Sequence, residues 1–199
     1  MTDSLTPLQR RVIDALRGLG WTLTGGGALA GYHLGHRRTR DLDFFWHGRS
    51  SLEHLPREVE EHLAAAGLAY RREVDARSFC RIAVTDGHAT VPIDLVAEPV
   101  PWVEPPVEVA PGILVDAPQE ILTNKLTALL SRWEVRDLID VRALVAAGTD
   151  LDRAIGDAPR KDGGFSPPIL AWVPDTTPHV GLTPELITFR NELVAKLLR

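Results

Sequence analysis

The sequence is poor in cysteine and in long apolar runs. Cys80 is the single cysteine, which excludes an internal disulfide framework and a cysteine-rich zinc site. The longest uncharged stretch, residues 18–35, holds seven glycines, so it is turn-rich and unlike a membrane span. Asp3 lies near the start and no apolar segment typical of a signal peptide follows it. We therefore expect a cytoplasmic protein.

The sequence also lacks an excess of basic residues. It has 22 Lys and Arg against 27 Asp and Glu in 199 residues, a net charge of −5, and 44% of its residues are hydrophobic. No overall basic field marks a nucleic-acid binder, so any RNA contact must use a local patch. The candidate patches are Arg37, Arg38 and Arg40; Arg71, Arg72, Arg77 and Arg81; Arg132 and Arg136; and Arg160 and Lys161.

Residues 21–46 hold the most informative pattern. An apolar strand ending at Thr24 runs into Gly25, Gly26 and Gly27, which open a short helix. Glycines at a helix N-terminus leave backbone N–H groups free to face an anion, so this turn predicts half of a phosphate site. His36 and Arg38, on the basic link that follows, are candidates to assist the phosphates.

Acidic residues supply the other half. Asp41 and Asp43 stand two apart in an extended run and so project from the same face. Two carboxylates on one face repel each other, and a hard divalent cation such as Mg²⁺, shared with substrate phosphates, relieves this repulsion. Asp94 stands among apolar residues of a later strand, where a lone carboxylate is costly unless it meets a cation. If the two strands are neighbours, the three carboxylates converge.

The remaining pattern predicts an α+β protein. Helices are expected from Pro7 and from Pro56, antiparallel strands at 70–74, 79–84 and 91–96, and helices at 118–132, 135–147, after Asp150 and after Thr183. Six prolines between Pro99 and Pro118 indicate a linker or an extended crossing, and residues 158–165 indicate a loop with phosphate reach. We expect three parts: residues 1–98, a proline-rich connection at 99–117, and a helical part at 118–199.

Lys125 lies inside the apolar stripe of the helix predicted at 118–132, and a lysine on a buried face needs an anion. Asp137 lies on the inner face of the next helix. Two interpretations stay open: the two residues pair and tie the helices together, or Lys125 reaches the nucleotide phosphates and Asp137 orients it.

Four separated motifs together resemble the AbiEii/AbiGii toxin group of nucleotidyltransferases, in the polymerase-beta-like superfamily. The motifs are residues 24–29 (TGGGAL), 36–45 (HRRTRDLDFF), 93–96 (IDLV), and 124–129 (NKLTAL) with 136–140 (RDLID). One departure is that the family often has Ser or Thr where this chain has Gly27, so a hydroxyl contact to phosphate is missing.

The resemblance implies a minimal nucleotidyltransferase fold at 1–98, with a helical part at 118–199 that completes the cleft. It implies an enzyme that moves a nucleotide from an NTP to an acceptor, with Mg²⁺ or Mn²⁺ as cofactor. In relatives the acceptor can be the tRNA 3′ end, which blocks translation, and a separately encoded antitoxin can restrain the toxin. It further implies that Asp41, Asp43 and Asp94 hold metal, and that Lys125 and Asp137 match the family's C-terminal functional pair.

Two other functions fit parts of the pattern. Gly25-x-Gly27-x-x-Ala30 after a strand also fits a dinucleotide-binding fingerprint, although the following strands predict an antiparallel meander instead of a parallel sheet. The alternative of another class is a toxin-like binding or regulatory module that has lost catalysis.

Overall fold

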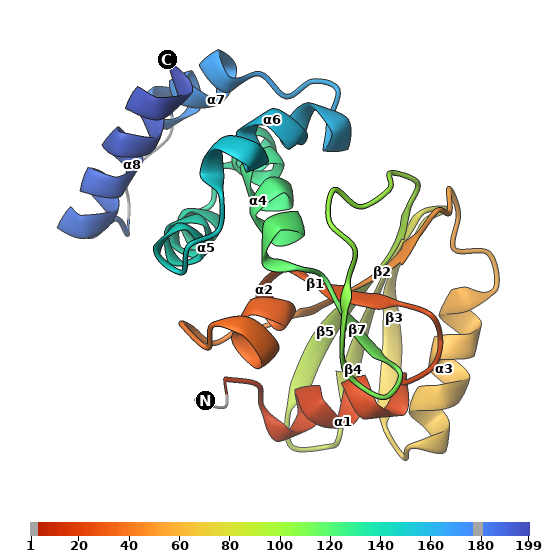
Figure 1. Ribbon diagram of the computed structural model, residues 1–199. Coiled ribbons are helices and arrows are strands. Elements are labelled where there is room, and N and C mark those ends of the chain that lie inside the picture. The colour runs from red at the N-terminus through yellow and green to blue at the C-terminus, as the bar shows by residue number, and fades with distance from the viewer. Residues whose placement is uncertain (1–3, 177–180) are drawn as a thin grey trace. The chain divides into compact units, whose positions relative to one another are not determined.

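The computed structural model describes residues 4–176 and 181–199. The chain forms two compact units, Met1–Ala117 and Pro118–Arg199, and each is described by itself. The first unit holds a mixed sheet with helices, and the second is helical (Figure 1).

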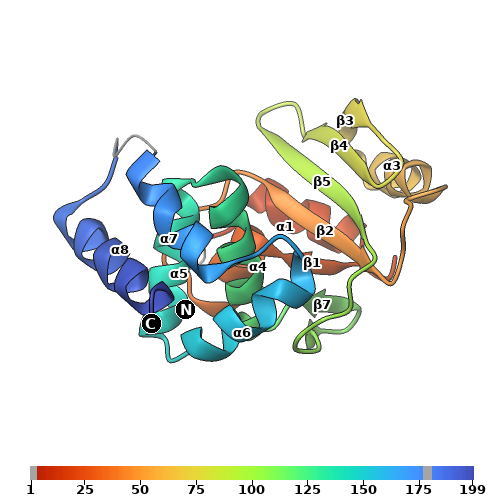
Figure 2. The ribbon, with the colours of Figure 1, turned by 90° about the horizontal axis from the view of Figure 1, so that it is seen from above.

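The first unit is built on a seven-stranded sheet with the order β3-β4-β5-β2-β1-β7-β6. β2 and β5 are parallel, as are β1 and β7, whereas β3, β4 and β5 form an antiparallel meander. Figure 2 shows β5, β2 and β1 side by side. The strands are β1 (Thr22–Thr24), β2 (Leu42–His47), β3 (Ala69–Asp75), β4 (Phe79–Thr85), β5 (Thr90–Glu98), β6 (Val107–Ala110) and β7 (Ile113–Val115). The helices are α1 (Pro7–Ala15), α2 (Gly25–Ala28), the π-helical turn η1 (Leu29–His33) and α3 (Leu55–Ala65).

Side chains alternate between the two faces of the central strands. Leu42, Phe44 and Trp46 of β2 are buried, while the intervening residues are partly exposed. The buried face continues through Leu95 of β5, which lies opposite Phe44, and through Cys80 of β4, which lies opposite Leu95. Helices α1 and α3 pack together and against the sheet (Figure 1), so this face carries the core and the polar residues are left on the other.

The proline-rich stretch differs from the predicted connection, because it contains two strands of the sheet. β7 is an interior strand between β1 and β6, and both lie within the first unit. The prolines do not interrupt the ladder, since Pro106 and Pro111 stand just outside β6 and Pro118 opens the next helix.

The second unit consists of helices α4 (Pro118–Arg132), α5 (Val135–Ala146), α6 (Leu151–Lys161), α7 (Pro167–Thr176) and α8 (Pro184–Leu197). Asp150 and Thr183 cap α6 and α8 as N-cap residues through their side chains. The loop predicted at 158–165 is wrong in its first half, because α6 continues through Pro159 to Lys161. Pro159 has no N–H to donate to the carbonyl of Ile155, so α6 lacks one backbone hydrogen bond there.

The predicted α+β fold class is confirmed by this mixed sheet and its helices. Among the helices of residues 4–176 and 181–199, none is long and apolar enough to span a membrane.

Candidate active site

Polar side chains form a row across four adjacent strands of the sheet. Asp43 of β2 lies opposite Asp94 of β5, and Asp94 lies opposite Arg81 of β4. On the other side, Asp43 lies opposite Thr24 of β1. Residues directly opposite each other point to the same face of a sheet, so this face carries Arg81, Asp94, Asp43 and Thr24 in that order. The sequence-based expectation that Asp94 lies beside Asp43 agrees with this register.

The glycine turn lies directly against Asp43. Gly25 has a left-handed φ of +59°, and a Cβ built on it would be 2.6 Å from Asp43 Oδ2. Only glycine fits this position without displacing the carboxylate. The start of the short helix α2, whose first backbone N–H groups have no partner within the helix, therefore abuts the row of acidic residues.

The other two glycines face different surroundings. A Cβ at Gly26 would lie 2.7 Å from Thr39 Oγ1 and 3.2 Å from Arg37 Nη2. A Cβ at Gly27 would instead lie 3.0 Å from Leu42 Cδ2 and 3.4 Å from Leu23 Cδ1. A side chain at position 27 would thus start toward the apolar core, whereas the Thr39 hydroxyl lies beside Gly26.

Asp41 is held through a chain of hydrogen bonds that begins in α1. The buried Thr39 hydroxyl donates to Asp41 Oδ1 over 3.0 Å. Gln9 Nε2 donates to the Thr39 carbonyl over 3.1 Å, and Gln9 Oε1 accepts from the backbone of Thr6 in the capping box of α1. Both Gln9 and Thr39 are buried, so the segment before β2 has a fixed path.

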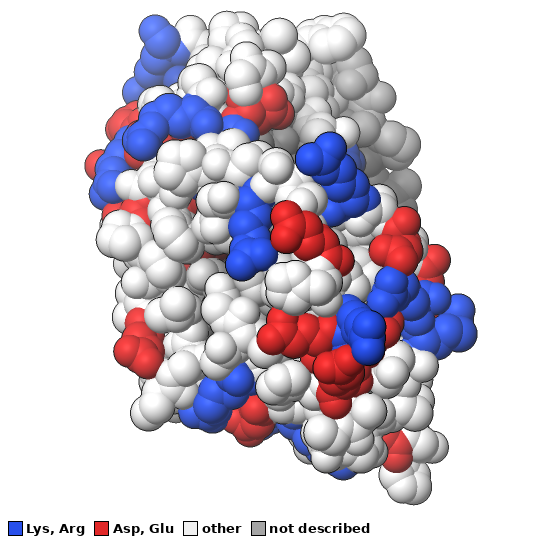
Figure 3. Space-filling view, turned by 90° about the vertical axis from the view of Figure 1, so that its right-hand side faces the viewer, with Lys and Arg blue, Asp and Glu red and all other residues white. Residues whose placement is uncertain are grey.

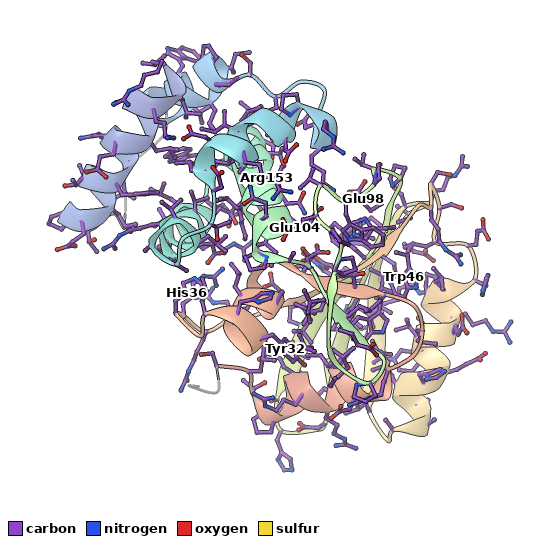
Figure 4. All side chains as sticks on the ribbon, in the orientation of Figure 1. Tyr32, His36, Trp46, Glu98, Glu104 and Arg153 are labelled. Carbon is purple, nitrogen blue, oxygen red and sulfur yellow. The ribbon has the colours of Figure 1, made fainter. Side chains whose placement is uncertain are left out.

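The arginines of the basic link between η1 and β2 differ in their exposure to solvent. Arg38 and Arg40 are exposed, whereas Arg37 is partly buried beside Gly26. Figure 4 shows His36 on this segment, with Tyr32 in the turn before it and Trp46 inside the unit. Arg37 is therefore nearer to the glycine turn than its position in the sequence suggests, while Arg38, the predicted phosphate contact, reaches solvent.

Arg81 engages Asp94 with both ends of its guanidinium group. Its Nε donates to Asp94 Oδ1 over 2.7 Å and its Nη2 donates to Oδ2 over 2.6 Å. The hydrogen bonds that Arg81 donates to Asp94 raise the pKa of Arg81, and the negative charges of Asp94, Asp41 and Asp43 raise it further, against the effect of burial. Arg81 therefore stays charged and neutralises part of the acidic row.

The pairing of Arg81 with Asp94 affects which carboxylates of the row could hold a divalent cation. Within residues 4–176 and 181–199, no group of three or more His, Cys, Asp or Glu is arranged to hold a metal ion. The carboxylates of Asp41 and Asp43 remain as candidate ligands, because Mg²⁺ is usually held by one or two carboxylates together with substrate phosphates. Asp94, the third predicted ligand, has a partner that the sequence analysis did not anticipate, since both of its oxygens accept hydrogen bonds from Arg81.

The helical unit holds a buried charge cluster around Lys125. Its ammonium lies 2.6 Å from Asp137 Oδ1 and 2.9 Å from Asp140 Oδ2, and both carboxylates are fully buried. Arg132 Nε donates to Asp137 Oδ2 over 3.0 Å. Lys125 and Asp137 therefore pair, as one of the two interpretations of the sequence required. A second buried pair, Lys161 with Glu120, joins α6 to α4.

Three residues that contact the predicted site residues were not themselves predicted as part of the site: Asp140, Arg81 and Thr39. Asp140 follows Asp137 by three residues, which places both on one helix face. Arg81 could have been found by counting the register outward from the Asp86-Gly87 turn, because the hairpin pairs Thr85 with Thr90 and hence Arg81 with Asp94. Thr39 had no such indication, because its position depends on the path of an irregular segment.

Most of the predicted basic patches are compensated by acidic neighbours. Arg72 pairs with Glu60 and Asp75, and Arg71 pairs with Glu73. Arg132, Arg136, Arg160 and Lys161 are likewise in ion pairs. Figure 3 shows basic and acidic side chains intermixed on the face that it displays. These patches therefore carry little net positive charge.

Comparison with known proteins identifies the class to which this fold and site belong. Residues 8–166 match the model of the family described as nucleotidyl transferase AbiEii toxin, type IV TA system. The chain belongs to this family, and the protein is a nucleotidyltransferase. Its resemblance to the AbiEii group, stated from the four motifs, is thereby confirmed.

Solved structures agree with the fold. JHP933 from Helicobacter pylori is 22% identical, with a TM-score of 0.61 over 96% of this chain and 88% of that chain. A second H. pylori structure, described as a candidate nucleotidyltransferase, is 22% identical, with a TM-score of 0.58 over 96% of this chain and 93% of the other. No curated protein matches the chain. The dinucleotide-binding alternative is excluded by the antiparallel meander and the family match.

Proposed function

We propose that the protein transfers an NMP from an NTP to the 3′ hydroxyl of an RNA, such as tRNA, forming a phosphodiester bond and releasing pyrophosphate. A divalent cation would be the cofactor, and the protein would act in this way as a toxin. The observation that carries the proposal is the contact between the glycine turn and Asp43, where a Cβ at Gly25 would be 2.6 Å from the carboxylate. A phosphate-binding turn and a cation-binding carboxylate at one place suit the triphosphate of an NTP.

Asp41 and Asp43 would hold the cation, Mg²⁺ or Mn²⁺. When bound, the cation would neutralise negative charge on the phosphates and help to orient them. The backbone N–H groups at Gly25, Gly26 and Gly27 would bind phosphate oxygens.

Asp94 is the proposed group that accepts the proton of the acceptor hydroxyl or joins the cation, because it stands next to Asp43 in the row. Thr39 would keep the Asp41 carboxylate in place through its 3.0 Å hydrogen bond. Arg37, partly buried beside Gly26, and the exposed Arg38 and Arg40 would add positive charge at the edge of the turn.

Lys125 and Asp137 would contribute to activity by ordering the helical unit, since the ammonium group of Lys125 already pairs with two buried carboxylates. A separately encoded antitoxin is the proposed protein partner, because the family is that of type IV toxin-antitoxin systems.

The test is to incubate the protein with each labelled NTP, Mg²⁺ and total RNA, and to identify the species that gains label. We expect label on RNA, and its loss when Mg²⁺ is chelated. Asp43→Asn should abolish transfer, whereas Asp152→Asn, a matched change at an exposed carboxylate of α6, should not. Transfer by a folded Asp43→Asn variant, or label only on protein, would contradict the proposal.

A further inference from the structure

The two side chains of the Arg81–Asp94 pair differ in their exposure to solvent. The Asp94 side chain is 10% exposed, whereas that of Arg81 is 42% exposed. Asp94 cannot lose its partner without leaving a buried carboxylate uncompensated, which is costly. Arg81 can leave Asp94 and be hydrated, so the pair can open if another cation replaces the guanidinium group.

The cation that could replace the guanidinium group is a divalent cation held by Asp43. Asp94 lies directly beside Asp43 on the parallel neighbouring strand, and Arg81 approaches it from the opposite side, on β4. A cation held by Asp43 would therefore lie on the side of Asp94 away from Arg81. While both Asp94 oxygens accept hydrogen bonds from Arg81, two of their four lone-pair sites are occupied and the carboxylate charge is partly neutralised, so Asp94 binds a metal more weakly.

We propose that Arg81 is a positioning residue that competes with the divalent cation for Asp94. In this structure Arg81 holds Asp94 by two hydrogen bonds; with a divalent cation at Asp43, Asp94 would exchange the guanidinium group for the cation. This inference rests on the proposed function, because it assigns a role in cation binding at the same site. It accounts for the absence of a three-carboxylate metal site in the part of the chain that the structure describes.

The exchange also has a consequence for Arg81. Once released, its guanidinium group lies beside the acidic row with five donors available, and a planar donor fork suits a phosphate group. Arg81 would then donate hydrogen bonds to the triphosphate of the NTP or to the phosphate backbone of the acceptor.

The test measures Mn²⁺ binding to the full chain without nucleotide, by electron paramagnetic resonance. Arg81→Met should bind Mn²⁺ about tenfold more tightly than the wild type, because a charge-assisted pair no longer competes for Asp94. Arg81→Lys keeps the charge without the fork and should show a smaller gain. Arg71→Met removes the same charge from the adjacent strand β3, where Arg71 pairs with Glu73, and should leave binding unchanged.

The double variant Arg81→Met with Asp94→Asn identifies the route of the effect. If the gain arises at Asp94, the double variant should lose it. Unchanged, weaker or undetectable Mn²⁺ binding in both arginine variants, with thermal melts showing that they are folded, would overturn the inference, as would a gain that persists in the double variant. Tighter binding by Arg81→Met in a protein that transfers no nucleotide would uphold the competition and refute the proposed function.

Discussion

Replacing Lys125 with methionine should destabilise the helical unit, because it removes the cation from a buried cluster. The wild-type cluster balances Lys125 and Arg132 against Asp137 and Asp140. Without the ammonium, Asp137 keeps its 3.0 Å contact with Arg132, but Asp140 loses its 2.9 Å contact with Lys125. Breaking a buried pair costs about 3–5 kcal/mol, and the remaining contact of Arg132 places our expectation near the lower end, at about 3 kcal/mol.

The measurement is the free energy of unfolding from denaturant titration, followed by circular dichroism. Lys196→Met is the matched control, since Lys196 pairs with the exposed Asp152 at the surface and should cost less than about 1 kcal/mol. Combining Lys125→Met with Asp140→Asn restores the charge balance, so the double variant should be more stable than the sum of the single effects predicts. A loss below about 1 kcal/mol for Lys125→Met, or strict additivity in the double variant, would refute the reasoning.

Three further predictions concern the sheet unit. Thr39→Val should lower nucleotide transfer about tenfold while Thr39→Ser retains it, because only serine keeps the hydrogen bond to Asp41; equal rates in the two variants would argue against a role for the hydroxyl. Gly25→Ala should abolish transfer and lower the melting temperature, because its Cβ would lie 2.6 Å from Asp43 Oδ2 at a φ of +59°; an active variant of wild-type stability would show that this fit is unimportant. Burial raises the pKa of the Cys80 thiol from 9.0 to about 11, so the buried protonated thiol stabilises the fold fully below pH 9, and this stabilisation is lost as the pH rises toward 11. Denaturant titrations of Cys80→Ala should therefore show a smaller loss of unfolding free energy over this pH range than those of the wild type, and equal losses would contradict the assignment.

The sequence predicted the elements whose local pattern agrees with their tertiary surroundings. Alternation in β2 and β5 predicted which residues face the core, and the carboxylates at 43 and 94 stood out because they occupy the opposite positions. Helix α4 begins at Pro118 and ends at Arg132, as its apolar stripe indicated. In these segments, propensity and packing require the same conformation.

The rest depends on contacts between distant segments. β6 and β7 are short and surrounded by prolines, so only the pairing of β7 with β1, and of β6 with β7, makes them strands. The bond between Arg81 and Asp94 requires the length of the hairpin loop to be known as well as the residue types. Arg37 and Thr39 acquire their places from an irregular segment held by Gln9, for which periodicity gives no information.

The parallel pairing of β2 with β5 has a consequence for synthesis on the ribosome. Asp43 and Asp94 become neighbours only after α3, β3 and β4 have been made and β5 has inserted between β4 and β2. A nascent chain that ends before β5 carries the glycine turn and Asp43 but lacks the adjacent carboxylate. Chains released before β5 has been made therefore contain no assembled acidic row, however many of them accumulate.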